Sequence, residues 1–336
     1  MAFDNGYPDS SLGRDRSGER YLRTTFQESR SWERDSGVLF LWIDLRGVSS
    51  LAACAGEESN NFGVFPVIGI FIANLICISR ASVVSTGDFN KDFFDTWSPS
   101  HVNTSIDGTA RSLKLDNNSG SGFASNDMFL FGQIDMPIKL IPGYSAGTVV
   151  AFYTEFLGTV PGEPYILQTN VFVDGFDDRE ERISLWFDPT KDSIPIRYYG
   201  TFTRLFMVDW IPLRTYRNHV DKGVAFPRWQ PMSIKISIWN GESWATHGGK
   251  DKIDWSRGPF IASFVNYKID ASVWKGNVCR AGSETNWWNK DRYNSLTWTQ
   301  RRWFKWARKY HMIYDYCQDN NRFQNNLPKE CSLPKY

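Results

Sequence analysis

The sequence predicts an all-β fold, a sandwich of antiparallel sheets, on three observations. From about residue 86, apolar and polar side chains alternate in short runs. PG, DG, NG and GG turns separate these runs, as in antiparallel sheets. Aromatic residues reach 16%, with 15 Trp, which suits either a thick core between packed sheets or a cleft that stacks on sugar rings. The 336 residues leave room for one large domain or two small ones.

The chain begins with a segment unlike the rest. Residues 1–61 contain Arg but no Lys and show no sustained periodicity, so we expect disorder or an extension introduced by gene prediction. Residues 62–79 are uncharged and mostly apolar, and small residues follow Arg80. The segment 62–85 therefore resembles a signal peptide displaced from the N-terminus. A short membrane anchor is the alternative, which Pro66, Gly69 and Asn74 weaken.

Three runs predict half-buried strands. Residues 132–140 and 231–239 alternate strictly, and residues 182–188 (RISLWFD) follow the same pattern. The predicted inward side chains of the first two runs are Ile134, Met136, Ile138 and Leu140, and Met232, Ile234, Ile236 and Ile238.

One helix is predicted, within residues 299–317. Trp303, Ala307, Tyr310 and Tyr314 fall on one face of it. Its five Lys and Arg, interleaved with aromatics, could indicate nucleic-acid binding. Most of them take the opposite face, however, and the chain balances 38 basic against 37 acidic residues, so no nucleic-acid partner is expected.

The strand YILQTNVF (165–172) carries the first sign of a site. Its core-facing set is Leu167, Thr169, Val171 and Val173, while Gln168 and Asn170 share the other face with Ile166 and Phe172. Amides in mid-strand are costly if buried dry, so they indicate a wet cleft that binds sugar hydroxyls, or else a plain solvent-facing sheet. Nearby, Glu155 is the one acid in AFYTEFLGTV, whereas sugar cleavage normally uses two carboxylates.

The resemblance to a known family rests on motifs in a fixed order. These are SGSGF (119–123), LFGQIDMPIKLIPGYSAGTVVAFY (130–153), EFLG (155–158), GEPYILQTNVF (162–172), DREERISLWFDPTKD (178–192), GVAFPRWQPMSI (223–234), SWATHGGKDKIDWS (243–256), NWW (286–288) and HMIYDYC (311–317). From about residue 84 onward the chain resembles the plant xyloglucan endotransglucosylase/hydrolases of glycoside hydrolase family sixteen.

This resemblance implies a jelly-roll domain over 86–265, whose concave face binds a β-glucan, and an extension over 266–336 with a helix, an added strand and disulfides. It also implies cleavage of xyloglucan with retention, through a covalent glycosyl-enzyme, and transfer of the chain to another xyloglucan end or to water. No cofactor and no metal are implied. The expected protein is a monomer secreted to the cell wall or apoplast, with xyloglucan as its partner and no stable membrane partner.

The catalytic strand of this family reads E-x-D-x-E-F-L-G, with a nucleophile first and an acid/base last. Glu155 matches the acid/base, but AFYT runs directly into EFLG, so the nucleophile and the middle Asp are missing. Thr154 has no carboxylate and points to the other face, and Asp135 lies on a different strand. Residues 193–206 also replace a family strand.

Three hypotheses follow from this truncation. The first is an active locus whose sequence lacks part of an exon, which the clean join between two intact motifs favours. A real polypeptide could instead bind xyloglucan without cleaving it, which the surviving cleft residues favour. The third, a β-sandwich interaction protein unrelated to carbohydrate, is disfavoured by the ordered motifs.

The resemblance also assigns substrate-binding positions and one disulfide. Without it, a plain surface ion pair would be the simpler interpretation of each charged residue. His247 stands where the family has Arg, and Ser272 replaces a Cys that would pair with Cys279. Among five cysteines, Cys317 and Cys331 match a family pair. The binding positions are Gln168, Thr169 and Asn170 near the cleavage point, Asp178, Arg179 and Glu180 on the acceptor side, Trp244 as a stacking platform, and Gly248 and Arg322.

Overall fold

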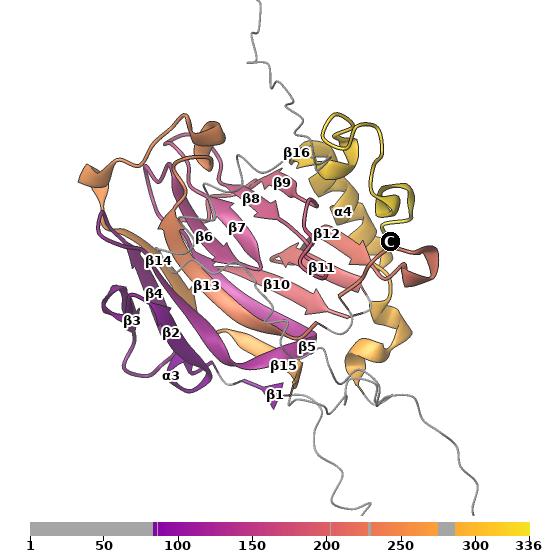
Figure 1. Cartoon of the computed structure of the whole chain (residues 1–336). Helices are drawn as coiled ribbons and strands as arrows, with labels where there is room; N and C mark the ends of the chain where they lie inside the picture. Colours follow the sequence, from indigo (N-terminus) through magenta and orange to yellow (C-terminus); the bar gives the residue numbers. More distant parts are fainter. Residues whose placement is uncertain (1–82, 86, 202, 228–229, 275–285) are drawn as a thin grey trace, which may run out of the picture. The chain divides into compact units, whose positions relative to one another are not determined.

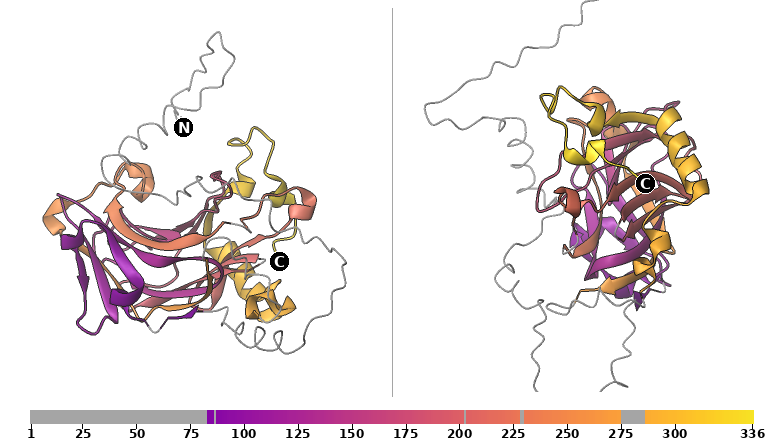
Figure 2. Two further views of the ribbon diagram at one scale, coloured as in Figure 1. Left: turned by 60° about the horizontal axis from the view of Figure 1, so that its bottom comes forward. Right: turned by 90° about the vertical axis from the view of Figure 1, so that its right-hand side faces the viewer.

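The computed structural model describes residues 83–85, 87–201, 203–227, 230–274 and 286–336. The expected segment 1–61, nearly all of 62–85, and Cys279 lie outside these residues. The described part is mostly β-structure, in agreement with the predicted all-β class, and Figure 2 shows its strands in curved layers. No helix in the described part of the chain has the length and apolar character needed to cross a membrane.

Sixteen antiparallel strands form one hydrogen-bonded network in the described residues. The main path runs β12-β11-β10-β5-β13-β6-β7-β8-β9-β16 (Figure 1). The strands are β1 (Val83–Val84), β2 (Phe93–Trp97), β3 (Val102–Thr104), β4 (Ala110–Leu115), β5 (Ser121–Lys139), β6 (Thr148–Phe152), β7 (Thr154–Leu157), β8 (Ile166–Thr169), β9 (Glu181–Ser184), β10 (Ile194–Gly200), β11 (Thr203–Val208), β12 (Ile211–Arg217), β13 (Met232–Asn240), β14 (Phe260–Val265), β15 (Lys268–Val273) and β16 (Met312–Asp315).

Two α-helices and several short 3-10 turns complete the described part. The helices are α3 (Phe89–Asp92) and α4 (Trp298–Tyr310). The turns are Pro99–His101, Val220–Lys222, Thr246–Gly249, Trp255–Arg257, Trp287–Asn289, Asp291–Tyr293, Tyr316–Gln318 and Lys329–Ser332.

β5 links the two layers of the predicted jelly-roll sandwich. Its first part pairs with β2 and β13, and its second part pairs with β10, β14 and β15. The inward residues predicted for β5 and β13 enter one continuous core, which also takes Val150, Phe152, Phe156 and Leu167 from β6, β7 and β8. The alternation of β5 and β13 is confirmed, because the period of two turns every second side chain inward.

The predicted helix exists, but of the face predicted for it only Ala307 is buried. α4 begins at a capping box, in which Thr297 and Gln300 exchange side-chain and backbone hydrogen bonds. It ends at Tyr310, since residues 312–315 form β16 and pair with β9. Phe304 and Ala307 are buried, whereas Trp303 and Tyr310 are exposed. Tyr314 therefore belongs to a strand, and a strand residue cannot extend a helical face.

The C-terminal extension is closed by the predicted disulfide. Cys317 and Cys331 are bonded, with their Cα atoms 5.2 Å apart. The bond closes a loop beside β16, next to the strands that carry the predicted site.

Candidate functional site

Glu155 lies on β7, between β6 and β8. It stands opposite Ala151 of β6 and opposite Gln168 of β8. Thr154 and Phe156, its neighbours along the strand, are buried on the core side. Glu155 therefore points to the face that turns away from the core, which we call the site face and define by Ser237, Ala151, Glu155, Gln168 and Arg182 on β13, β6, β7, β8 and β9.

A row of polar side chains crosses the site face. Gln168 donates its amide N–H to Glu155 over 2.7 Å, and its amide oxygen accepts from Arg182 over 2.6 Å. The Arg182 guanidinium lies 5.9 Å from the ring of Tyr314 on β16. Gln168 is buried, but both ends of its amide are satisfied, so the cost of a dry amide does not arise.

The Glu155 carboxyl has a raised pKa. Burial raises its pKa to about 7, and the charge of Glu180 acts in the same direction. The Gln168 hydrogen bond and the Arg182 charge oppose this rise. A carboxylic acid that keeps its proton near neutrality can protonate a leaving oxygen, which is the requirement on a general acid.

A second polar cluster lies beyond β9. Arg322 donates to both oxygens of Glu180, at 2.7 and 3.2 Å, and to Asp178 at 2.6 Å. It also donates to the Tyr314 hydroxyl at 3.1 Å. Tyr314 thus joins this cluster to Arg182 and, through Gln168, to Glu155.

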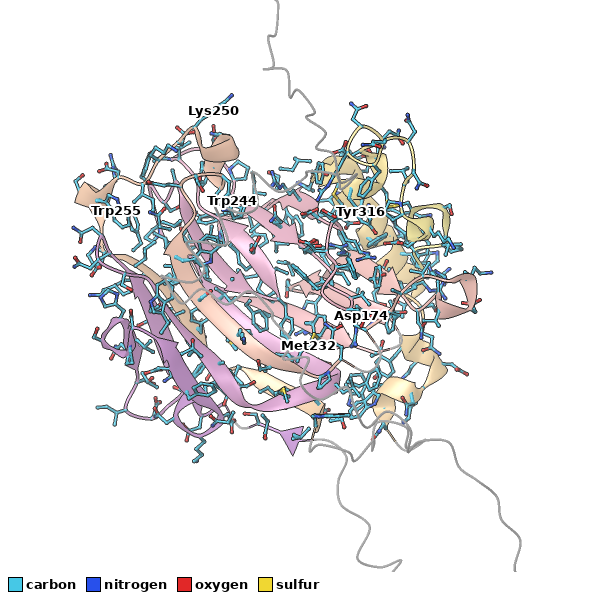
Figure 3. All side chains as sticks on the ribbon, viewed as in Figure 1. Asp174, Met232, Trp244, Lys250, Trp255 and Tyr316 are labelled. Atoms are coloured by element: carbon cyan, nitrogen blue, oxygen red, sulfur yellow. A yellow bond between two sulfur atoms is a disulfide. The ribbon has the colours of Figure 1, made fainter. Side chains whose placement is uncertain are left out.

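Trp244 lies one register row away from Glu155 on the same side. It contacts a small apolar cluster that includes Val149 and Leu157, which are two residues from Ala151 and Glu155 along their strands. Figure 3 labels Trp244 among the side chains. Its ring lies 6.0 Å from that of Trp239. A half-exposed indole beside the polar row is suited to stacking on a sugar ring.

The loop that carries Trp244 is held by His247. Its imidazole contacts Glu163 at 2.9 Å and Asp251 at 2.5 Å. The Asp251 hydrogen bond and the Glu163 charge raise the pKa of His247. His247 and Gly248 both have positive φ, at 48° and 67°, and a side chain at 248 would meet no neighbour within 4 Å, so this turn is open.

Three predicted binding residues make other contacts. The Thr169 hydroxyl accepts from Arg214 at 3.0 Å on the core side, away from Glu155. Asn170 uses its side-chain oxygen to accept from the backbone N–H groups of Val171 and Arg179. Arg179 pairs with Glu330 at 2.7 Å and donates to three backbone carbonyls. These contacts hold the 170–179 loop to the C-terminal extension.

Three residues on this side of the sheet were not predicted as site residues from the sequence. Arg182 and Tyr314 complete the polar row, and Lys235, half-buried on β13, has a pKa that burial lowers. Alternation could have indicated Arg182, which is two residues after Glu180. Tyr314 could not be found in this way, because the pattern was interpreted as helix.

Among the described residues, no second carboxylate lies beside Glu155. β6 and β7 are joined by Tyr153 alone, which has a φ of 48° and stacks on Tyr198 at 4.5 Å. Neither strand that pairs with β7 contains an acid. Glu180 lies two strands away and two residues along from the row of Glu155, so their backbones are more than about 10 Å apart by the spacing of strands. Asp135 pairs with Arg197 on β10.

The matches of this β-sandwich to protein families define its class, that of carbohydrate-active proteins. Residues 89–257 match the glycosyl hydrolases family 16, and residues 282–331 match the xyloglucan endo-transglycosylase C-terminus. Among the described residues, no group of three His, Cys, Asp or Glu side chains could hold a metal.

Sequence relatives place the chain within that class. It is 61% identical over 295 residues to "Probable xyloglucan endotransglucosylase/hydrolase protein 10" of Arabidopsis thaliana, covering 83% of this chain and 99% of that one. It is 43% identical to protein 7 of the same series, covering 73% and 88%, and 43% identical to "Xyloglucan endotransglucosylase protein 34" of Populus tremula x Populus tremuloides, covering 72% and 87%. The chain belongs to the xyloglucan endotransglucosylase/hydrolase family.

Proposed function

We propose that this protein binds xyloglucan on the site face and does not cleave it. The observation that carries the proposal is the junction at Tyr153. It joins β6 directly to β7, and neither strand paired with β7 offers a carboxylate next to Glu155. A retaining mechanism needs two carboxyls about 5–5.5 Å apart. Glu155 can give a proton to a leaving oxygen, but no glycosyl-enzyme can form without the nucleophile.

Binding does not depend on the missing group. Glu155, Gln168 and Arg182 offer donors and acceptors in a row, and Tyr314 and Arg322 continue the polar surface on the acceptor side. Trp244 supplies an apolar platform one row away. We expect an affinity between millimolar and high micromolar, which corresponds to about 4–6 kcal/mol.

The names of the relatives support xyloglucan as the ligand, and action in the plant cell wall is proposed with it. Secretion to the apoplast and a monomeric state belong to the same proposal. Size-exclusion chromatography of the purified chain and detection of a tagged copy in the wall fraction would test them.

The direct test is incorporation of a labelled xyloglucan oligosaccharide into xyloglucan. The parent protein and Glu155→Gln should give the same background signal. A parent signal well above that of Glu155→Gln would overturn the proposal.

The clean join between two intact motifs supports a second candidate function, that of an active transglucosylase whose full transcript restores the strand. Sequencing the transcript across the Thr154–Glu155 junction separates the two. An inserted E-x-D-x segment would favour the enzyme.

A further inference from the structure

The outward face of α4 carries a row of exposed side chains. Trp298, Arg302, Lys305 and Lys309 recur at i, i+4, i+7 and i+11, so they follow one another along a single line of the helix. All four are exposed, opposite the buried Phe304 and Ala307. We call these four residues the cationic stripe. It extends over about 16 Å at 1.5 Å per residue.

The charges of this stripe are not balanced within the described part of the protein. No described carboxylate pairs with Arg302, Lys305 or Lys309, although Arg308 on the same helix pairs with Glu181 at 2.8 Å. The three cations lie instead over aromatic rings: Arg302 at 4.8 Å from Trp298, Lys309 at 5.0 Å from Tyr310, and Lys305 at 5.7 Å from Tyr336.

Stability of the helix does not explain this arrangement. Lys309 lies in the last turn of α4, where a cation is favourable to the helix dipole, but the first turn has no acid, and Arg301 and Arg302 near the N-terminus oppose that dipole. An exposed indole such as Trp298, which is 71% accessible, also gains little from folding. Cations without partners, held beside exposed rings, are what a ligand that is both anionic and ring-shaped requires.

A groove beside the stripe gives a second, independent observation. It has a volume of about 660 Å³ and lies between α4 and the C-terminal residues 334–336. Lys305 and Lys309 line it together with Phe304 and Tyr336. No Asp or Glu side chain lines it. The stripe therefore borders a hollow with a cationic rim and an aromatic floor.

This surface lies on the other side of the sheet from Glu155. Glu181 and Arg182 are consecutive on β9 and so point to opposite faces. Glu181 contacts Arg308 of α4, whereas Arg182 leads through Gln168 to Glu155. The views agree in placing α4 along the strands β12 and β16 (Figures 1 and 2).

We propose that the cationic stripe and its groove bind an acidic polysaccharide composed of uronic acid residues. Each uronate ring offers an apolar face for the indole and one carboxylate for a cation. An extended chain of such rings can follow three cations placed along one line of a helix. A neutral glucan has no negative charge to pair with these cations, so this site is distinct from the site face. The proposal for it holds whether or not the site face binds xyloglucan.

Nucleic acid is the competing polyanion, and the charge of the whole chain disfavours it. The formal net charge is only +1, whereas nucleic-acid-binding proteins are usually strongly basic. The stripe has three cations in single file, and the neighbouring cations have protein partners: Arg308 and Lys335 pair with Glu181 and Asp315, and Arg301 donates to the Leu296 carbonyl.

The test is binding of the full chain to immobilised polygalacturonate at low ionic strength, where exposed charges are least screened. The double variant Lys305→Glu, Lys309→Glu should bind about tenfold or more weakly, since two attractive contacts become repulsive. The matched control is Lys139→Glu, Lys191→Glu, which makes the same change in net charge at two exposed lysines away from α4. The control should change the affinity by less than about twofold.

Trp298→Ala should weaken binding by about threefold and leave its salt dependence unchanged, because the ring contributes stacking and not charge. Thermal unfolding of each variant checks that the fold is retained. Three results would overturn the proposal: no binding of polygalacturonate by the parent, equal losses in the two double variants, or tighter binding of single-stranded DNA than of polygalacturonate.

Discussion

The two sides of β7 differ in how completely their groups are partnered. Toward β8, β9 and β16, each polar side chain of the row has its contact: Glu155 with Gln168, Gln168 with Arg182, and Arg322 with Glu180. Toward β6, the strand stops at Thr154, and one residue with a positive φ makes the connection.

The difference separates binding from covalent catalysis. Binding groups come from several strands, and each strand keeps its register through its own ladder. Loss of a segment from one strand therefore leaves the other groups in place. The resemblance puts the nucleophile and the acid/base of this family on one strand, so under the proposed function the same loss removes covalent catalysis.

The largest effect should come from restoring the strand. Inserting the corresponding segment of the 61% identical relative between Thr154 and Glu155 should place a nucleophile near the acid/base. We expect a gain in transglucosylation of at least about 1,000-fold over the parent, because covalent catalysis usually supplies that much.

The matched control is the same insertion with Gln in place of its first Glu, which should stay at background. A folded insertion variant without activity would show that the truncated strand is not the only defect. The changed segment 193–206, which forms most of β10 and β11, would then be examined next.

The second-largest effect should come from the side of β7 whose polar groups have partners. Arg308 contacts Glu181 at 2.8 Å and also Asp315, and both carboxylates are almost completely buried. Arg308→Met leaves them with Lys335 alone, at 3.6 and 3.1 Å. Breaking a buried ion pair from one side should cost about 3–5 kcal/mol in the free energy of unfolding.

Urea unfolding measures this change, with Lys305→Met as the control on the same helix. Lys305 is exposed and has no ionic partner in the described residues, so its substitution should stay within about 0.5 kcal/mol. Similar losses in both variants would mean that the helix, and not the ion pair, is responsible.

The third effect depends on pH. Burial raises the folded pKa of Glu155 to about 7 from an ordinary value of 4.5, so the folded protein holds the proton more tightly than the unfolded chain. The resulting stability is complete below about pH 4.5 and is lost as pH rises through 7.

The substitution Glu155→Gln removes this loss of stability at high pH. The variant should match the parent at pH 4 and exceed it by about 2–3 kcal/mol at pH 8, after allowance for the partly exposed carboxyl. Urea unfolding at the two pH values gives the difference. An equal difference at both would assign the effect to packing instead of titration.

Alternation in the sequence was enough to predict the core of β5 and β13 and the direction of Glu155 and Gln168. A period of two determines both, whatever the strand pairs with. The face of α4 was missed because a run of aromatics and cations continues through Tyr310 into β16, and only the pairing of Met312–Asp315 with β9 shows where the helix ends.

Contacts between residues far apart in the sequence could not be predicted from the pattern either. Arg179 and Glu330 are 151 residues apart. Because of their ion pair, Arg179, which was predicted to bind substrate, supports a loop instead. The polar row through Arg182 and Tyr314 likewise needs the register of β8, β9 and β16, which pattern alone does not supply.

The smallest effect tests whether the surviving surface binds sugar at all. Trp244 packs beside Trp239 over Val149 and Leu157, and it stays half-exposed next to the polar row. One sugar ring stacked there should contribute about 1 kcal/mol beyond its area. Trp244→Ala should therefore weaken binding of a xyloglucan oligosaccharide about fivefold, measured by NMR titration. Trp303→Ala, which removes an exposed indole from α4, is the control and should leave the affinity unchanged. If the folded parent does not bind, or if both variants bind as the parent does, Trp244 is a packing residue and the polar row is an ion-pair network without a ligand.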